Sequence, residues 1–525
     1  MAQFNVDQAM QIAIRNHRAG KLAEADKIYR QVLSHNPNHP EALHLLGAVA
    51  GQIGRLDAAI ELIRRAITIN PGAAEYHYNL GNILRDKKRL DEAIMEYRQA
   101  LKLRPNFVQA QNNLGSLLRD QGLLDEAIAA FGEARRIDPG GVEVYNNLGS
   151  ALREKGNPDE AIIAYRQALR LKPDLAEAHN NLGVALGDLG LLEEAMAEFR
   201  QAIRIRPDYA EAHNNLSLAL LVKGDFAQGL PEYEWRWRWK GFRTAWRKFS
   251  QPMWDGTELN GRTILLHAEG GLGDTLQYVR YVPMAANRGG KVVLECQAEL
   301  FRLLKGLPQV EQLVCVNQPL PRFDVHCPLM SLPLVLGTRL ETIPGHTPYL
   351  GVDARLKESW AKRLGPSDGE LRVGLAWSGN PKFKNDRTRS IALSRLAPLA
   401  AVPGVTFHSL QKGPGSEQIS SAPAGMRLID HAPDLEDFAD TAAVISLMNL
   451  VISTDNSRVN LAGALGVPTW VMLQYVPDWR WLLEREDSPW YPTVRLFRQK
   501  SLGDWPEVIQ RVARELENFK EGGSL

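Results

Sequence analysis

The sequence predicts a solenoid of paired helices followed by an α/β region built from two Rossmann-like halves. Two observations carry this prediction. Small residues and prolines recur every 34 residues through the first part of the chain, which is the period of a stacked helical-hairpin repeat. From Arg262 onward the pattern changes to short apolar runs, followed by glycines and then by helical patterns, which is typical of strand–turn–helix units.

Three sets of residues keep the 34-residue step. They are the small residues Gly47, Gly81, Gly115, Gly149, Gly183 and Ser217, the alanines Ala25, Ala59, Ala93, Ala127, Ala161 and Ala195, and the prolines Pro37, Pro71, Pro105, Pro139, Pro173 and Pro207. Small residues let the two helices of a hairpin approach closely, and proline ends the second helix because it cannot continue one. The sequence therefore predicts tetratricopeptide repeats over residues 1–230. Six complete repeats are expected to begin near residues 6, 40, 74, 108, 142 and 176, and a degenerate seventh near residue 210.

An asparagine also repeats in step, on the first helix of each predicted hairpin. The column consists of Asn79, Asn113, Asn147, Asn181 and Asn215. An apolar core disfavours amides, so these side chains are expected along the inner face, where an amide suits the main chain of an extended peptide. The column resembles that of the eukaryotic O-GlcNAc transferases, which implies that it binds an acceptor peptide. The alternative is that each amide bonds a neighbouring repeat and sets the superhelical pitch.

Residues 231–260 form a junction in which aromatic and basic residues alternate. Its members include Tyr233, Trp235, Arg236, Trp237, Arg238, Trp239, Phe242, Trp246, Arg247, Lys248 and Trp254. Stacking on single-stranded nucleic acid is one interpretation. However, the helical pattern runs directly into this segment, and a terminal repeat must bury its last apolar face. We therefore expect a wedge against the following domain, with arginines that snorkel, pair or face an anionic ligand, and no nucleic-acid partner.

The two α/β halves are predicted over residues 261–370 and 371–525. In the first half, strands are expected at 263–268, 291–295, 312–316 and 324–327, with a glycine turn at 269–275. In the second, strands are expected at 373–377, 405–410, 450–453 and 470–473, and helices from Ser394, near 459–465 and at 505–519. Leu276 stands where the third glycine of the dinucleotide fingerprint would be, which argues against NAD. Ligands of such sheets bind at the carboxyl ends of the strands.

Five segments carry a family resemblance. They are Gly-Leu-Gly-Asp-Thr at 271–275, Trp-Ser-Gly-Asn-Pro at 377–381, Ser-Thr-Asp-Asn-Ser at 453–457, Leu-Ala-Gly-Ala-Leu-Gly at 461–466, and Asp-Trp-Arg-Trp-Leu-Leu with Asp-Ser-Pro-Trp-Tyr-Pro within 478–492. Over nearly its whole length the chain resembles bacterial tetratricopeptide proteins whose catalytic region is similar to the ADP-heptose heptosyltransferases of glycosyltransferase family 9. The resemblance implies a GT-B fold, with an acceptor-side first half, a nucleotide-sugar second half and inverting transfer.

Sugar transfer from a nucleotide requires a base for the acceptor hydroxyl and positive groups for the departing diphosphate. Asp274 follows the glycine turn and matches the family's Gly-Asp motif, which implies that it is the catalytic base; capping of the next helix is the alternative. The predicted donor-binding residues are Gly271, Gly273, Lys384, Arg389, Asp455, Asn456 and Ser457. For Lys384 and Arg389, a solvated basic loop is the alternative. The sequence departs from the family pattern at Asn460, where a histidine is usual.

Composition narrows the remaining choices. The 62 Lys and Arg residues balance the 61 Asp and Glu residues, so overall charge gives no sign of a nucleic-acid binder. The three cysteines, Cys296, Cys315 and Cys327, fit neither a disulfide framework nor a zinc site. No Asp-x-Asp motif occurs in the C-terminal half, so neither a metal nor a cofactor is implied. Without a signal peptide or a bilayer-length apolar run, the expected location is the cytoplasm.

The sequence thus predicts a glycosyltransferase that moves a sugar from a nucleotide-sugar to a protein hydroxyl, with the repeat groove holding the polypeptide acceptor. One alternative keeps the enzyme but gives it a glycolipid or polysaccharide acceptor. Another is a non-catalytic scaffold with a decayed transferase domain, for which Asn460 is the strongest support. The nucleotide, the sugar, the acceptor and the existence of a homo-oligomer stay open.

Overall fold

The computed structural model describes residues 5–242, 244, 246–367, 369–381 and 386–522. The chain divides into two compact units, Met1–Leu186 and Gly187–Leu525. Within the described residues, no helix is long and apolar enough to cross a bilayer.

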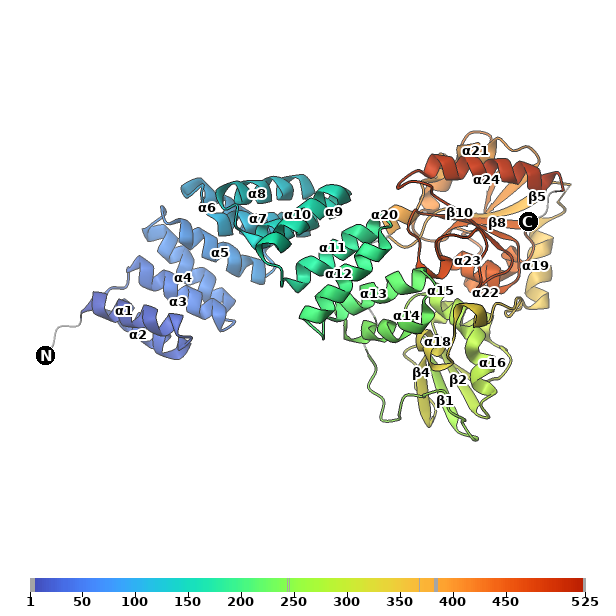
Figure 1. The fold of residues 1–525 in the computed structure, drawn as a ribbon, viewed down its shortest axis with the longest axis horizontal. Helices are drawn as coiled ribbons and strands as arrows, with labels where there is room; N and C mark the ends of the chain where they lie inside the picture. Colours follow the sequence, from blue (N-terminus) through green and yellow to red (C-terminus); the bar gives the residue numbers. More distant parts are fainter. Residues whose placement is uncertain (1–4, 243, 245, 368, 382–385, 523–525) are drawn as a thin grey trace. The chain divides into compact units, whose positions relative to one another are not determined.

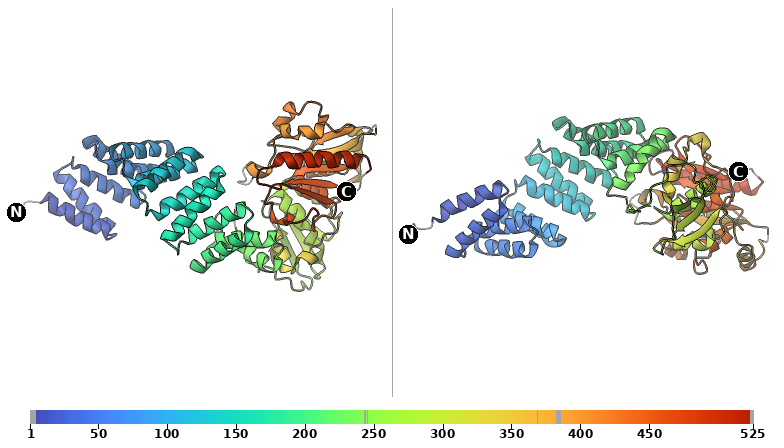
Figure 2. Two further views of the ribbon diagram at one scale, coloured as in Figure 1. Left: turned by 45° about the horizontal axis from the view of Figure 1, so that its top comes forward. Right: turned by 90° about the horizontal axis from the view of Figure 1, so that it is seen from below.

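The first unit is an array of antiparallel helical hairpins (Figures 1 and 2). Its helices are α1 (Val6–Arg18), α2 (Leu22–His35), α3 (Pro40–Gln52), α4 (Leu56–Ile69), α5 (Ala74–Asp86), α6 (Leu90–Leu103), α7 (Val108–Asp120), α8 (Leu124–Ile137), α9 (Val142–Lys155), α10 (Pro158–Leu171) and most of α11 (Ala176–Asp188). The first helix of every hairpin begins at the residue that the sequence predicts. Each second helix ends two residues before a repeated proline, because proline cannot extend it.

Close helix packing in the array depends on the repeated glycine. A Cβ atom added at Gly81, Gly115 or Gly149 would lie 2.7 Å from the ring of a tyrosine or phenylalanine on the second helix of the same hairpin. These rings, on Tyr97, Phe131 and Tyr165, are fully or almost fully buried. Only a residue without a side chain therefore leaves room for the ring, which confirms the packing role predicted from the 34-residue step.

The last hairpins belong to the second unit. Helix α12 (Leu192–Ile205) is followed by α13 (Ala210–Val222), a short α14 (Phe226–Tyr233) and the 3-10 turn η1 (Glu234–Arg238). Phe226 and Tyr233 lie in the same apolar cluster as Leu276 and Trp490 of the α/β region. The degenerate seventh repeat is thus built into the core of the α/β region, although its sequence still follows the period of the array.

The α/β region contains two wholly parallel sheets. The four-stranded sheet has the order β3-β2-β1-β4, and the six-stranded sheet has the order β10-β9-β8-β5-β6-β7. The strands are β1 (Thr263–His267), β2 (Lys291–Cys296), β3 (Val310–Cys315), β4 (Val325–Pro328), β5 (Leu371–Ala376), β6 (Val405–Ser409), β7 (Leu428–Asp430), β8 (Leu450–Thr454), β9 (Thr469–Leu473) and β10 (Val494–Arg498). All eight predicted strands are present, and β7 and β10 are additional.

Helices and 3-10 turns lie between and after the strands. They are α15 (Leu272–Tyr278), η2 (Val279–Tyr281), α16 (Val282–Ala286), α17 (Ala298–Leu304), η3 (Leu329–Ser331), α18 (Leu332–Val335), η4 (Leu340–Thr342), α19 (Ala354–Leu364), α20 (Asp386–Arg389), η5 (Leu393–Leu396), α21 (Ala397–Ala400), η6 (Ser416–Ser421), α22 (Phe438–Ile445), α23 (Ser457–Ala464), η7 (Trp479–Trp481) and α24 (Trp505–Lys520). The helix expected from Ser394 is reduced to η5 and α21, because Pro398 and Pro403 limit its length. Helix α24 lies beside the six-stranded sheet (Figure 1), and its Val512 and Leu516 share an apolar cluster with Trp470 of that sheet.

In the junction, Phe249 packs against Leu265, Val293 and Val314 of the four-stranded sheet. The ring of Phe249 lies 5.5 Å from His267 and 4.7 Å from His326, measured between centroids. Arg247 pairs with Glu295, whose side chain is completely buried. Trp235 stacks on His213 of α13 at 3.9 Å. These aromatic and basic side chains therefore bind within the chain, through an ion pair and stacked rings.

Candidate functional site

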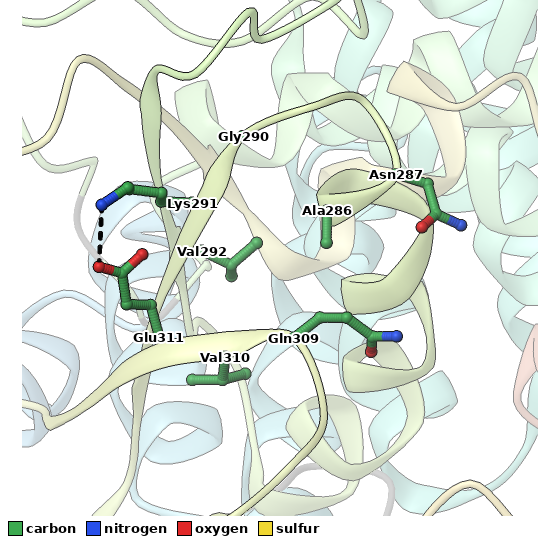
Figure 3. A pocket seen from close by; sticks show the side chains of 8 residues that line it. All are labelled: Ala286, Asn287, Gly290, Lys291, Val292, Gln309, Val310 and Glu311. Carbon is green, nitrogen blue, oxygen red and sulfur yellow. Dashed lines mark hydrogen bonds and ion pairs between the residues drawn. The ribbon is translucent and has the colours of Figure 1, made fainter.

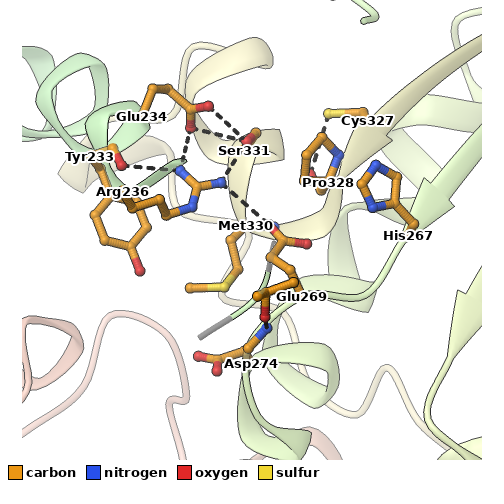
Figure 4. Close-up of polar contacts among 12 residues, drawn as sticks. Tyr233, Glu234, Arg236, His267, Glu269, Asp274, Cys327, Pro328, Met330 and Ser331 are labelled. Atoms are coloured by element: carbon orange, nitrogen blue, oxygen red, sulfur yellow. Dashed lines mark hydrogen bonds and ion pairs between the residues drawn. The ribbon is translucent and has the colours of Figure 1, made fainter. Parts of the chain in front are cut away.

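Asp274 lies where β1 turns into α15. Gly270 has a φ of 79°, and a Cβ atom there would lie 2.6 Å from Oδ2 of Asp274. The backbone N–H of Gly271 donates to the same oxygen at 2.7 Å (Figure 4). The carboxylate thus folds back over the glycine turn and caps its own helix, as the structural alternative predicts. Since this N–H is already bonded, Gly271 cannot offer it to a phosphate in this conformation.

The second oxygen of Asp274 pairs with a guanidinium from the other half of the α/β region. Nη2 of Arg480 donates to Oδ1 of Asp274, and Nη1 donates to the two oxygens of Asp478 at 2.9 and 3.0 Å. The side chain of Arg480 is only 13% exposed and that of Asp274 only 22%. Arg480 therefore joins carboxylates from both halves of the region.

Arg480 and Asp478 are absent from the site residues predicted above, although they stand in one of the five family segments. Their signal in the sequence is an arginine between two tryptophans, a few residues after a buried strand. The aromatic neighbours exclude water from the guanidinium: its carbon lies 5.2 Å from the ring centroid of Trp479 and 5.6 Å from that of Tyr278.

Burial raises the pKa of the Asp274 carboxyl above its usual range, Arg480 and the Gly271 N–H oppose this, and Asp478 adds to it. A raised pKa makes the ionised carboxylate a stronger proton acceptor. Arg480, whose own pKa is raised by the carboxylates although its burial opposes this, keeps its charge. The pair therefore places a basic carboxylate beside a permanent cation.

Asp455 follows β8 in the six-stranded sheet. Burial raises the pKa of its carboxyl to about 6, with Asp478 adding to the effect and Arg389 opposing it. Asn456 caps α23 by accepting a hydrogen bond from the N–H of Arg458 at 3.0 Å, and Ser457 is the first residue of that helix. The predicted donor-binding residues Asn456 and Ser457 therefore lie at the start of α23.

Helices α15 and α23 pack against each other through Gly273. A Cβ atom at Gly273 would lie 2.9 Å from Nδ2 of Asn460 and 3.5 Å from Cα of Ser457. Oδ1 of Asn460 accepts a hydrogen bond from the hydroxyl of Tyr491 at 3.0 Å. Asn460 is thus a buried packing contact between the two halves, and Gly273 faces that contact.

Arg389 lies beside the carboxyl end of β5. Its Nε donates to Asp386 at 3.2 Å, and a Cβ atom at Gly379 would lie 2.8 Å from its Nη2. Strands β5 and β8 are neighbours at the point where the strand order reverses, which is where such sheets bind ligands. Arg389, Asp455 and Asn456 therefore lie at this point. Lys384 lies outside the described residues.

No described histidine is part of the charged cluster formed by Asp274, Asp455, Asp478 and Arg480. Nε2 of His267 lies 3.2 Å from Nδ1 of His326, and burial lowers the pKa of His267 to about 3, so both rings serve as neutral packing groups. Within the residues described, no group of three or more His, Cys, Asp or Glu side chains could hold a metal ion.

The asparagine column bonds one repeat to the next. Nδ2 of Asn147 donates to Oδ1 of Asn112 at 3.0 Å, and Nδ2 of Asn181 donates to Oδ1 of Asn146 at 3.1 Å. Asn113 donates to Tyr78 and Asn82, and Asn79 lies 2.7 Å from a ring nitrogen of His44. The predicted alternative, in which the amides tie neighbouring repeats together, is therefore present for these four residues. Asn215 also has a polar interaction.

Two hollows are lined by other residues. One of about 430 Å³ lies in the array and is lined by Val108, Gln109, Asn112, Asp138, Gly141, Val142, Glu143, Val144, Lys172 and Leu175. The other, about 390 Å³, lies at the amino ends of β2 and β3, where Lys291 and Glu311 pair at 3.2 Å (Figure 3). Asn112 lines the first hollow and also accepts the hydrogen bond from Asn147 of the asparagine column.

Comparison with known proteins identifies the array. Residues 17–74, 54–106 and 78–142 match one model of the tetratricopeptide repeat, and residues 149–190 and 188–224 match another. The N-terminal part of the chain therefore consists of tetratricopeptide repeats, a class that commonly binds peptides or proteins.

One curated relative is Protein FlbA of Caulobacter vibrioides, which is 30% identical over 325 residues, covering 57% of this chain and 54% of FlbA. The chain thus spans about half the length of that relative.

Several solved structures are similar to part of the chain. MamA is 29% identical, with a TM-score of 0.30, over 31% of this chain and 95% of MamA. YrrB, described as a TPR protein with an unusual peptide-binding site, is 22% identical, with a TM-score of 0.32, over 35% of this chain and 95% of YrrB. PilF of Pseudomonas aeruginosa is 22% identical, with a TM-score of 0.34, over 37% of this chain and 88% of PilF. TM-scores this low carry no conclusion about function.

Proposed function

We propose that the chain is a metal-independent GT-B glycosyltransferase that moves a sugar from a nucleotide-sugar to a hydroxyl of a protein. One observation carries the proposal: Arg480 gathers Asp274, which follows a strand of the first sheet, with Asp478 and the neighbouring Asp455 of the second half. Parallel sheets bind ligands at their carboxyl ends. A basic carboxylate and fixed cations at such ends are the groups that sugar transfer requires.

The proposed reaction is a single displacement. The oxygen of the acceptor hydroxyl bonds to the anomeric carbon while the bond from that carbon to the diphosphate oxygen breaks. Asp274 takes the hydroxyl proton, and the electron pair leaves with the nucleotide. Arg480 keeps Asp274 ionised through the ion pair, and Arg389 balances the negative charge of the leaving group at the end of β5.

The proposed acceptor is a polypeptide held by the array. Because the amide nitrogens of Asn113, Asn147 and Asn181 bond neighbouring repeats, the column would present its oxygens to the N–H groups of an extended segment. The hollow beside Asn112 contains Asp138, Glu143 and Lys172. A segment carrying charges of both signs fits such a lining.

The test begins with donor binding. Thermal unfolding of the full-length protein is measured with UDP, GDP, ADP and CMP in turn. One nucleotide is expected to stabilise the protein, by about 3 kcal/mol at a hundred times its Kd. Turnover is then measured with UDP-N-acetylglucosamine, GDP-mannose, ADP-glucose and CMP-N-acetylneuraminate. If none of the four nucleotides stabilises the protein, the proposal is wrong.

Asp274→Asn is the matched variant, because it keeps the size of the side chain and one oxygen for the Gly271 N–H. It should retain the nucleotide-induced shift and lose turnover by a factor of about 100 to 10,000, the usual contribution of a general base. Turnover equal to that of the wild type would remove Asp274 as the base while leaving the donor site in place.

A second candidate function is a non-catalytic scaffold. It is favoured by the observation that both oxygens of Asp274 and the N–H of Gly271 are already bonded within the chain. The scaffold requires no nucleotide, so the same panel separates it from the transferase.

A further inference from the structure

A buried arginine from the end of the repeat region lies next to the glycine turn. Arg236, in η1, is 0% exposed. Its Nη1 donates to Glu234 at 2.6 Å, and its Nη2 donates to Ser331 at 2.7 Å and to Glu269 at 3.3 Å. Figure 4 shows the guanidinium between Glu234 and Glu269. A side chain of the junction is thus bonded to two segments that follow strands of the first sheet.

Glu269 connects this arginine to the turn that carries Asp274. It is 3% exposed, it directly precedes Gly270, and its Oε1 also accepts the N–H of Met330 at 2.9 Å. Burial raises the pKa of Glu269 to about 8, and Arg236 is the largest opposing influence. Removal of Arg236 would therefore favour the neutral carboxyl and weaken the hydrogen bond that Glu269 accepts from Met330.

We propose that Arg236 is a positioning residue for the transfer reaction: through Glu269 it fixes the glycine turn, and with it Asp274. The inference rests on the proposed function and extends it, because it makes a residue of the junction a part of the acceptor-side site.

A gain in folding stability does not explain why Arg236 and Glu269 are buried together. Buried ion pairs are often replaced by apolar residues at no cost in stability, because desolvation cancels much of their attraction. The network also leaves Nε of Arg236 and Oε2 of Glu269 without partners among the described residues. What the network supplies is fixed geometry, since three side chains from three chain segments, Glu234, Glu269 and Ser331, converge on one planar guanidinium. The position of a base is sensitive to such geometry.

The experiment compares Arg236→Met with Arg238→Met in the full-length protein. Arg238 lies in the same short turn, is exposed, and places its guanidinium over Trp235 at 4.6 Å, so it is a matched control. In Arg236→Met, amide hydrogen exchange across residues 269–278 should rise about tenfold. Turnover of the nucleotide-sugar that the wild type uses should show a kcat lowered about 100-fold, as expected for a displaced base. The KM for the donor should stay within about twofold, because uniform binding is unchanged.

Unchanged exchange across 269–278, or raised exchange with unchanged kcat, would overturn the inference. If the wild type turns over none of the four donors, the proposed function fails, yet the exchange measurement still decides whether Arg236 fixes the turn. Should Arg236→Met fail to fold, Glu269→Gln replaces it. This variant keeps the volume and the acceptor for Met330, and the same rise in exchange and fall in kcat are expected at smaller size.

Discussion

The repeat array and the α/β region achieve close packing with different chemistry. In the array, glycines face buried rings and the charged side chains stay at the surface. In the α/β region, Arg236, Glu269 and Glu295 are buried in polar contacts that occur once each. The difference shows that a repeated contact leaves a period in the sequence, whereas a single contact between distant residues leaves none.

The largest expected effect contrasts two ion pairs. Arg247→Met leaves Glu295, which is completely buried, without its cation; the second unit should lose about 3 to 5 kcal/mol of unfolding free energy. Arg98→Met breaks a pair with Glu126 whose side chains are 55% and 52% exposed, and should cost the array less than about 1 kcal/mol.

Denaturant unfolding of the two units can be followed separately, because all twelve tryptophans lie in the second unit. Tryptophan fluorescence therefore follows that unit, and far-UV circular dichroism follows the helices of both. Equal losses of unfolding free energy for Arg247→Met and Arg98→Met would contradict the expected difference between the buried and the exposed ion pair. Lys248→Met, at an exposed neighbour of Arg247, controls for the loss of a basic residue in the junction.

A smaller effect is expected at the glycines of the array. Gly149→Ala places a methyl group 2.7 Å from the ring of Tyr165 and should cost about 2 kcal/mol through overpacking. Gly132→Ala, on α8 with no atom near the added methyl, should instead stabilise the array by about 0.5 to 1 kcal/mol, because alanine favours a helix. The test is the dichroism transition of each variant, with the fluorescence transition unchanged. A loss at both positions would refute the packing role of Gly149.

The smallest expected effect concerns the asparagine ladder. Asn147→Ala and Asn112→Ala each remove one end of the 3.0 Å hydrogen bond and should each cost about 1 kcal/mol. In a double-mutant cycle, their coupling should be about 0.5 to 1 kcal/mol. A coupling near zero would show that the bond contributes nothing to the array and would leave peptide binding as the reason for the column.

The structure of the array could be predicted almost completely from the sequence, because its packing contacts are repeated. Helix starts, the glycine and ring pairs and the terminal prolines all follow from the 34-residue step. The direction of the amide bonds could not be read, since an amide offers donors and an acceptor alike. The structure shows that the donors are directed toward the preceding repeat.

For the α/β region, local patterns gave the strands but not the contacts between the halves. Asp274, Asp455 and Asn456 follow buried strands, so their places could be predicted. The ion-pair partners of Arg480 and Glu269 could not be predicted, because they lie up to 206 residues away along the chain. Strand β7 was missed because it has only three residues, and two of them are exposed.

The division of the chain at Gly187 falls inside α11, ahead of the last helices that carry the repeat pattern. A protein engineer who wished to exchange one array for another would therefore cut the gene at the wrong place by following the sequence repeats. Helices α12 to α14 and η1 have to remain with the sheets, since they supply Phe226, Tyr233 and Arg236 to the interior of that unit. The portable part of the array ends before them.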